Sequence, residues 1–232
     1  MGIAVSGISI AVGALLGRVF KKRIPFKNLH VLGIGIMILS AVGFFENIFA
    51  IGEFSLTSQR LIPVVLSLII GNTVGEAMKL EDRLSSLSGN KTAAMGAFVD
   101  ATLFFGVGGL QVSGPIVLAL TGDSGQLYLK SLIDFPFALM FGASYGAVAA
   151  ASALPVAAVQ ILTLLAAGAV GALFTDAAVS QLCAMGYIIL FFSGYNLLCE
   201  SNRKVKNVNM LPGIFIIILF SLAEQLLGIY GG

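Results

Sequence analysis

Charged residues are scarce in this sequence. Of its 232 residues, 10% are Asp, Glu, Lys or Arg, whereas 58% are hydrophobic. A soluble domain carries about 25% charged residues, so this composition excludes a soluble globular protein. The 13 basic and 11 acidic residues give a net charge of +2. That balance lacks the basic surface that nucleic-acid binding requires, so we expect no nucleic-acid partner.

Histidine and cysteine are also scarce. His30 is the one histidine, so we expect no metal site built on imidazole ligands. No nucleophile stands beside a base in the sequence, and we therefore predict neither an enzyme nor a cofactor. Cys183 and Cys199 lie 16 residues apart in one apolar stretch. That spacing is about 24 Å along a helix, so these two cysteines cannot form a disulfide with each other.

Long apolar stretches are abundant. A membrane helix needs roughly 20 predominantly apolar residues. Eight such stretches cover residues 2–20, 31–50, 61–78, 93–120, 131–153, 156–174, 182–199 and 210–229. The sequence therefore predicts an all-α fold, a polytopic membrane bundle of about eight transmembrane helices. No room is left for a soluble domain, so we treat residues 1–232 as a single integral membrane domain.

The positions of the basic residues predict an orientation. Cytoplasmic loops of membrane proteins carry an excess of Lys and Arg. With the N-terminus outside and eight spans, 11 of the 13 basic residues lie in cytoplasmic loops. Arg60 and Lys130 are then the two that remain outside. This interpretation places every basic residue in a loop or at a helix end.

The two ends of the chain resemble each other. Residues 33–40 and 186–193 both begin with Gly and end with Ser, and residues 63–76 and 212–224 both run from Pro to Glu. In the middle of the chain, Asp100 and Asp134 follow a β-branched residue in similar apolar surroundings. These matches predict two halves, 1–120 and 121–232, in an inverted repeat with a broken central helix pair, as in many secondary transporters. Chance similarity among 28 glycines is the alternative.

Acidic residues inside apolar stretches are candidates for ion coupling, because an ionisable group in hydrocarbon usually faces a cavity or a partner. The candidates are Asp100, Asp134, Glu76 and Glu224. Asp100 could instead be a structural carboxylate bonded to Thr102, and Asp134 could close a capping box that starts at Ser131. The two glutamates lie near helix ends, where a carboxylate can simply meet water.

The stretch 93–120 contains a concentration of helix-breaking residues. Four glycines and Pro115 fall within ten residues, and the polar groups that such a break frees must be satisfied by protein, water or ligand. Transporters bind substrates at breaks of this kind. The predicted substrate-binding residues are Gly106, Gly108, Gly109, Gln111 and Ser113 at the break, with Ser144 and Asn196 elsewhere. The alternative is close helix packing, which small residues promote and which the glycines at 13, 17, 142 and 146 also fit.

Four segments resemble a known family. They are FVDATLFFGVG (98–108), LTGD (120–123), KSLID (130–134) and GEAMKLEDRL (75–84). They are similar to the YqgA/YdfK-like bacterial inner-membrane proteins, a family of unknown function whose members are sometimes labelled transporters. The resemblance extends over the whole chain. It implies a location in the bacterial plasma membrane, but it implies no substrate.

Together these features favour a small secondary transporter of a solute or ion, coupled to a cation or proton, with its substrate site near residues 106–115. The expected partners are the lipid bilayer and the transported solute, and the small-residue faces would also permit a homo-oligomer. Two alternatives remain open. A passive channel would use the same cavity without alternation, and a non-transporting scaffold subunit would use the glycines for packing alone.

Overall fold

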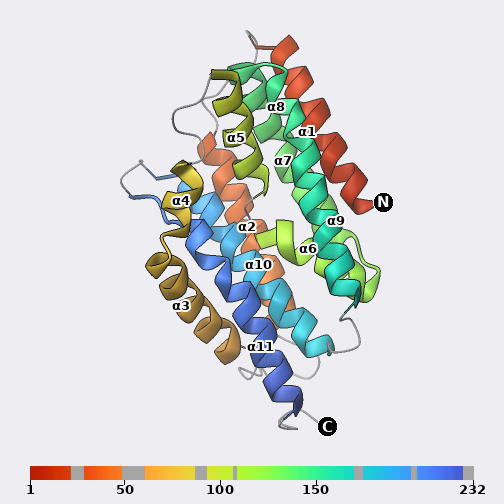
Figure 1. Ribbon diagram of the computed structural model, residues 1–232, viewed down its shortest axis with the longest axis vertical. Coiled ribbons are helices and arrows are strands. Elements are labelled where there is room, and N and C mark those ends of the chain that lie inside the picture. Colours follow the sequence, from red (N-terminus) through yellow and green to blue (C-terminus); the bar gives the residue numbers. More distant parts are fainter. Residues whose placement is uncertain are drawn as a thin grey trace.

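The computed structural model describes residues 1–21, 29–48, 61–86, 93–106, 109–169, 175–199 and 203–226. Within these ranges the regular structure is helical (Figure 1). The helices are α1 (Gly2–Val19), α2 (Leu29–Ile48), α3 (Leu61–Ala77), α4 (Leu80–Ser86), α5 (Ala93–Gly106), α6 (Gly109–Thr121), α7 (Gly125–Tyr145), α8 (Val148–Ala151), α9 (Ala153–Ala169), α10 (Asp176–Asn196), the 3-10 helix η5 (Asn207–Met210) and α11 (Pro212–Leu226).

Each of the eight predicted apolar stretches contains helix, and the stretch 93–120 is divided into α5 and α6. Two predicted starts are wrong. α7 begins at Gly125 rather than residue 131, and α10 begins at Asp176 rather than residue 182. Polar residues in the first two turns of these helices, Gln126 and Gln181 among them, lower the local hydropathy, so the apolar stretches begin later than the helices do. Both glutamines are buried inside the protein.

Four of the described helical segments are long and apolar enough to cross a membrane. They are Gly2–Val19, His30–Ile48, Val148–Ala169 and Ala177–Asn196. α5 and α6 together make a fifth candidate span if the bent pair counts as one. α3 and α11 are shorter, and polar side chains lower the mean hydropathy of α7. The protein is thus a multi-span membrane protein, while the number of eight spans stays a prediction.

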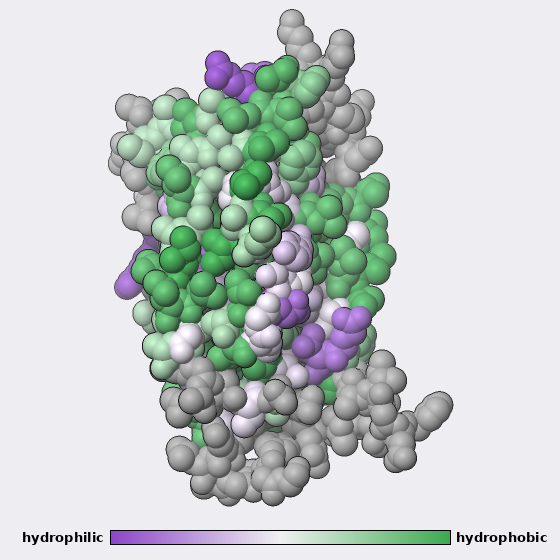
Figure 2. Space-filling model, turned by 90° about the vertical axis from the view of Figure 1, so that its right-hand side faces the viewer, coloured by the Kyte–Doolittle hydropathy of each residue, from purple (hydrophilic) through white to green (hydrophobic). Residues whose placement is uncertain are grey.

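The outer surface is apolar. Large aliphatic side chains are exposed on α1, α2, α3, α9 and α11, including Ile8, Val31, Ile62, Leu162 and Leu219. Figure 2 shows hydrophobic side chains over most of one side of the molecule. Water would make such a surface costly, whereas lipid chains solvate it well. The exposure of these side chains is therefore what a protein surrounded by lipid requires.

Glycines allow the closest helix contacts. α1 packs on α7 with both helices running in the same direction, since Gly2 lies against Leu127 and Gly17 against Leu139. The contact is close, because a side chain at Gly17 would collide with the backbone of Leu139, and one at Gly142 with the backbone of α1. This pair confirms the packing interpretation of those two glycines. α2 packs antiparallel on α10, and α3 antiparallel on α11, again through glycines.

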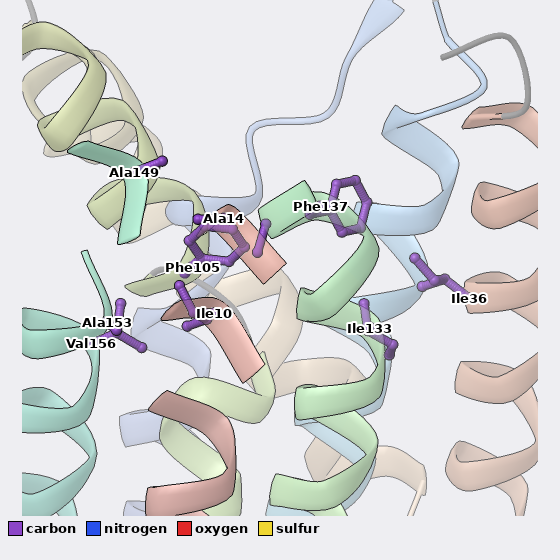
Figure 3. Close-up of a cluster of buried hydrophobic side chains, with 11 residues drawn as sticks. Ile10, Ala14, Ile36, Phe105, Ile133, Phe137, Ala149, Ala153 and Val156 are labelled. Atoms are coloured by element: carbon purple, nitrogen blue, oxygen red, sulfur yellow. The ribbon is translucent and has the colours of Figure 1, made fainter. Parts of the chain in front are cut away.

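The buried apolar side chains form two clusters. One joins α1, α5, α7, α8 and α9, with Ile36 of α2 at its edge, and Figure 3 shows Phe105 and Phe137 among its members. The other joins α2, α3, α6, α9, α10, η5 and α11 around Met185 and Ile214. α6 lies at the centre of the molecule between α9 and α10 (Figure 1). It contributes Ile116 to the second cluster, whereas α2 and α9 contribute residues to both clusters. The candidate site lies beside α6.

Candidate binding cavity

The break between α5 and α6 creates the centre of the site. α5 ends at Gly106, α6 begins at Gly109, and their axes differ by 53°. The last carbonyl groups of any helix have no partner within that helix. One of them, the carbonyl of Phe105, accepts a hydrogen bond from Lys130 Nζ at 3.1 Å. A lysine from α7 thus satisfies backbone that the break leaves unpaired.

Lys130 also forms an ion pair with Asp134, one turn further along α7. The two residues are 6% and 7% exposed, so the pair is almost entirely inside the protein. Removing one partner of such a pair leaves an uncompensated charge in a poorly solvating medium, at a cost of about 3–5 kcal/mol. The prediction that every basic residue lies in a loop or at a helix end is therefore wrong for Lys130. Its charge is tolerated because a carboxylate and a carbonyl oxygen both face it.

The capping box considered for Asp134 is absent. Ser131 lies in the second turn of α7, and its hydroxyl donates to the carbonyl of Leu127 at 2.7 Å. The helix begins six residues earlier, after Ser124. In the loop before it, Asp123 Oδ1 accepts a hydrogen bond from the backbone N–H of Gly125 at 2.9 Å. Asp134 is therefore a mid-helix carboxylate whose partner is Lys130.

A cavity of about 320 Å³ lies against the ion pair. Its walls come from α2, α4, α5, α6, α7, α10, η5 and the segment that leads into η5. The wall is mostly apolar, and its aromatic side chains are Phe104, Phe105 and Phe137. Its polar side chains are Glu81, Gln111, Lys130, Asp134, Ser193, Asn196, Lys204 and Asn207. An apolar cavity with a few convergent polar groups is the usual form of a small-molecule site, and this one is near the lower end of the common size range.

The cavity has a deep end and an open end. Lys130 and Asp134 mark the deep end, where almost no surface is exposed. Lys204, an exposed residue, and Glu81 of α4 mark the open end. Lys130 is five residues from the start of α7, a rise of about 7.5 Å. The deep end therefore lies close to the exposed residues 121–123, which precede α7.

Hydrogen bonds hold the open end in shape. Asn196 Nδ2 donates to the carbonyl of Val205 at 2.8 Å, and Asn196 Oδ1 accepts from the N–H of Val205 at 2.7 Å. Glu81 Oε2 accepts from the N–H of Val208 at 2.9 Å. The side-chain amide of Asn207 is hydrogen-bonded to the Ser193 hydroxyl at 2.9 Å. Asn196 thus lines the cavity, but its amide is already used to brace the loop.

A chain of amides closes the deep end. Gln111 Nε2 donates to the carbonyl of Val156 at 2.9 Å, and Gln111 Oε1 accepts from Gln160 Nε2 at 2.9 Å. Gln160 Nε2 also lies 3.2 Å from Ser6 Oγ, to which it donates. The three side chains are fully buried and join α1, α6 and α9. Buried amides without partners would be costly in lipid, so this chain stabilises the contact between these helices.

A second bond lies beside this chain. Ser113 Oγ donates to Gln126 Oε1 at 2.8 Å, linking α6 to the first turn of α7. Ser113 also packs closely against Gly186 of α10, because a side chain added at Gly186 would approach the Ser113 hydroxyl to 2.5 Å. Gly109 is closer still, because a side chain there would collide with the carbonyl oxygen of Gly186. Ser113 and Gly109 therefore fix α6 against its neighbours, and Gly109 lines the cavity as well.

The structure brings some predicted site residues together and not others. Gly109, Gln111, Asp134 and Asn196 line the cavity. The others for which it describes side-chain surroundings lie outside that lining: Gly106, Ser113, Ser144, Asp100 and Glu76. Gly108 and the side chain of Glu224 fall outside the described residues. The hydroxyl of Thr102 has no hydrogen-bond partner among the described residues, so the predicted bond from Asp100 to Thr102 is not formed.

Sequence reasoning did not identify Lys130, Glu81, Lys204, Ser193 and Asn207 as site residues. Lys130 and Asp134 are four residues apart, the spacing at which opposite charges meet on one helix. This spacing predicts the ion pair only if both residues lie in one helix, and α7 starts early enough, at Gly125, to include them both. The other four come from three separate elements, and no local pattern connects them.

Two further features of the charges bear on the chemistry. No group of three or more His, Cys, Asp or Glu residues in the described part of the chain could hold a metal ion. At the surface, Lys206 Nζ donates to Asp82 Oδ1 at 2.6 Å, and this bond raises the pKa of Lys206 above its ordinary value. That second ion pair is about half exposed and is not part of the cavity wall.

Comparisons with known proteins agree with the resemblance seen in the sequence. The uncharacterized membrane protein YdfK of Bacillus subtilis (strain 168) is 27% identical over 220 residues, 93% of each chain. The uncharacterized protein YqgA of Escherichia coli (strain K12) is 24% identical over 237 residues, 96% of this chain and 97% of that one. No solved structure matches. The family described as "Protein of unknown function (DUF554)" matches residues 1–222, and the chain belongs to this family.

Proposed function

We propose that this protein is a small secondary transporter in the bacterial plasma membrane, and that the cavity beside α6 is its solute site. One observation carries the proposal: a cavity of about 320 Å³ ends at a broken helix and a buried ion pair. Buried charge inside a membrane protein is costly, and it is typically found on solute or ion pathways. Irregular backbone at membrane depth is likewise tolerated where it lines a cavity.

The helix pairs support an inverted repeat of eight spans. In the proposed repeat α1, α2, α3 and the α5–α6 pair correspond to α9, α10, α11 and the α7–α8 pair. Such a repeat requires that the contact of α1 with α7 recur as a contact of α9 with α5 and α6, and both contacts are present. α2 also faces α10, and α3 faces α11, an arrangement that is consistent with a two-fold axis between the halves. These matching contacts support the repeat over a chance similarity of glycine-rich sequences.

The same arrangement suggests an orientation. The open end of the cavity lies beside α4 and residues 203–207, where Lys204 and Arg203 are exposed. The positive-inside bias would place this end in the cytoplasm and the N-terminus outside. In this proposal the cavity is open to the cytoplasm, and the layer of Gln111, Gln160 and Ser113 is the closed gate on the outer side.

Asp134 is the acidic residue that this proposal assigns to coupling. It lines the deep end of the cavity, where an entering proton or cation would compete with Lys130 for its carboxylate. Gln111 and the Gly109 backbone, at the start of α6, would contact the solute. Asp100 is half-buried on α5 and does not line the cavity, so its part in coupling is a separate hypothesis.

Uptake into proteoliposomes tests the proposal. Labelled amino acids, sugars and organic acids would be offered with and without an imposed proton or sodium gradient. We expect one class to accumulate only when a gradient is present, and Asp134→Asn to abolish that accumulation. Asp100→Asn shows whether Asp100 takes part in coupling as well. Intact gradient-driven flux in this variant would show that it does not.

Two other results would replace the proposal. Flux far above the turnover of a carrier, with no accumulation against a gradient, would identify a passive pore that uses the same cavity. No flux of any solute would favour a scaffold role. The 53° bend between α5 and α6 argues against the scaffold, because a packing helix needs no such break.

A further inference from the structure

The charges along the cavity wall point to the class of solute. The described residues that line it include two acidic and two basic side chains, Glu81, Asp134, Lys130 and Lys204. One charge of each sign lies at the deep end and one of each sign at the open end. A wall of this kind does not favour a solute of either net charge, since each charge that attracts it has a repelling neighbour.

The ion pair itself has unused bonding capacity. An ammonium group has three N–H donors, and Lys130 uses one for Asp134 and one for the carbonyl of Phe105. Asp134 binds Lys130 through Oδ2, and no described group donates to its other oxygen. Both residues line the cavity. The deep end therefore offers a solute one N–H donor on the ammonium of Lys130 and one acceptor oxygen on the carboxylate of Asp134.

The rest of the deep wall is apolar. Phe104 packs against Phe137 with ring centroids 4.7 Å apart, and Ile133 and Leu110 complete this side. A solute that placed polar groups on the ion pair would therefore rest an apolar side chain on these rings. A solute with a single charge would leave one member of the ion pair facing a like charge in a poorly solvating site.

From these features we propose that the cavity binds a small zwitterion, an α-amino acid with an apolar side chain. Its carboxylate would accept from Lys130, and its ammonium would donate to Asp134. The net charge of the ion pair and its ligand is then zero, as is the net charge of the ion pair alone. This inference rests on the proposed transport function for its biological meaning, but ligand binding can be measured without any flux.

Three matched probes test the class: leucine, N-acetyl-leucine and leucinamide, which are a zwitterion, an anion and a cation of similar shape. Binding to the full-length protein in detergent would be measured by calorimetry and as a saturable rise in apparent Tm. We expect leucine to bind at least about tenfold more tightly than either other probe. The proposal would be overturned if N-acetyl-leucine or leucinamide bound more tightly than leucine, or if none of the three probes bound.

Variants of the ion pair provide a gain of binding that misfolding cannot imitate. Asp134→Asn leaves an ammonium alone, so the preference should change to N-acetyl-leucine. Lys130→Gln leaves a carboxylate alone, so the preference should change to leucinamide. Lys206→Gln and Asp82→Asn remove the same charges outside the cavity wall and should leave the preference for leucine unchanged. An unchanged preference in both cavity variants would contradict the proposed site.

The outcomes separate the two proposals. Leucine binding without flux in proteoliposomes would keep the zwitterion site and remove the transport function. Gradient-driven flux of another solute, without leucine binding, would keep transport and remove the proposed class.

Discussion

The ion pair of Lys130 and Asp134 allows a quantitative test of the architecture. Each residue is less than a tenth exposed, so either single substitution leaves a charge without its partner. We expect Lys130→Gln and Asp134→Asn each to lower the free energy of unfolding by about 3–5 kcal/mol. Lys130→Gln should lie at the upper end, since it also removes the bond to the carbonyl of Phe105, worth about 1 kcal/mol.

The double variant is the informative member of the cycle. Without coupling, the two losses would add to about 6–10 kcal/mol and the protein would not fold. With the pair formed, the double variant carries two neutral amides and should lose only about 1–3 kcal/mol. Unfolding in mixed micelles would measure all four proteins. The same cycle on the exposed pair of Lys206 and Asp82 is the control, and there we expect no measurable coupling.

Two results would refute this reasoning. A double variant less stable than either single variant would mean that the two charges do not stabilise each other. Single variants as stable as the unmodified protein would mean that water reaches both groups freely, as at a surface. In either case the deep end of the cavity would not be the enclosed site described above.

Three further predictions follow from the packing and the surface charges. Gly142→Ala should lower the free energy of unfolding in micelles by about 1–3 kcal/mol, because the added methyl group meets helix α1. Gly168→Ala is the control, since a side chain there meets open space and should not destabilise the protein. Equal losses in the two variants would contradict the close α1–α7 contact. Gln160→Leu should cost about 0.6–1.7 kcal/mol in the same assay, because it breaks the amide chain at the deep end, and an unchanged stability would exclude that chain. Asp82→Asn should lower the pKa of Lys206 in an NMR titration, since the bond to Asp82 raises that pKa. The stabilisation from this ion pair is fully present below the ordinary lysine pKa and is lost as pH rises through the raised value. An unchanged titration would show that the bond is absent in solution.

Much of the fold could be predicted from hydropathy alone. Every predicted apolar stretch contains helix, because a long apolar segment in a membrane must satisfy its backbone internally. The division of residues 93–120 could also be predicted, since glycines and Pro115 accumulate there. The start of α7 could not be found in this way, because Gln126 and Lys130 are buried by partners that are distant in sequence.

The candidate site was predicted only in part. Gln111 and Asp134 were identified because polar residues in apolar stretches are unusual, and both line the cavity. Lys130 was missed because hydropathy and the positive-inside bias assign a lysine to a loop unless a partner is known. Asn196 shows the opposite difficulty. It was chosen as an interior polar residue, and its hydrogen bonds to Val205 are visible only when the loop is folded.

The accessibility of the deep end from each side of the membrane tests the central claim most directly. Leu110→Cys, in a background with Cys183 and Cys199 replaced, would place a thiol in the cavity wall. A membrane-impermeant thiol reagent would be added to one side of proteoliposomes at a time. The account predicts labelling from the side of α4 alone at rest, and labelling from the other side once solute and a gradient are supplied. A thiol that reacts from neither side under any condition would contradict the account, and one that reacts from both sides at once would indicate a pore.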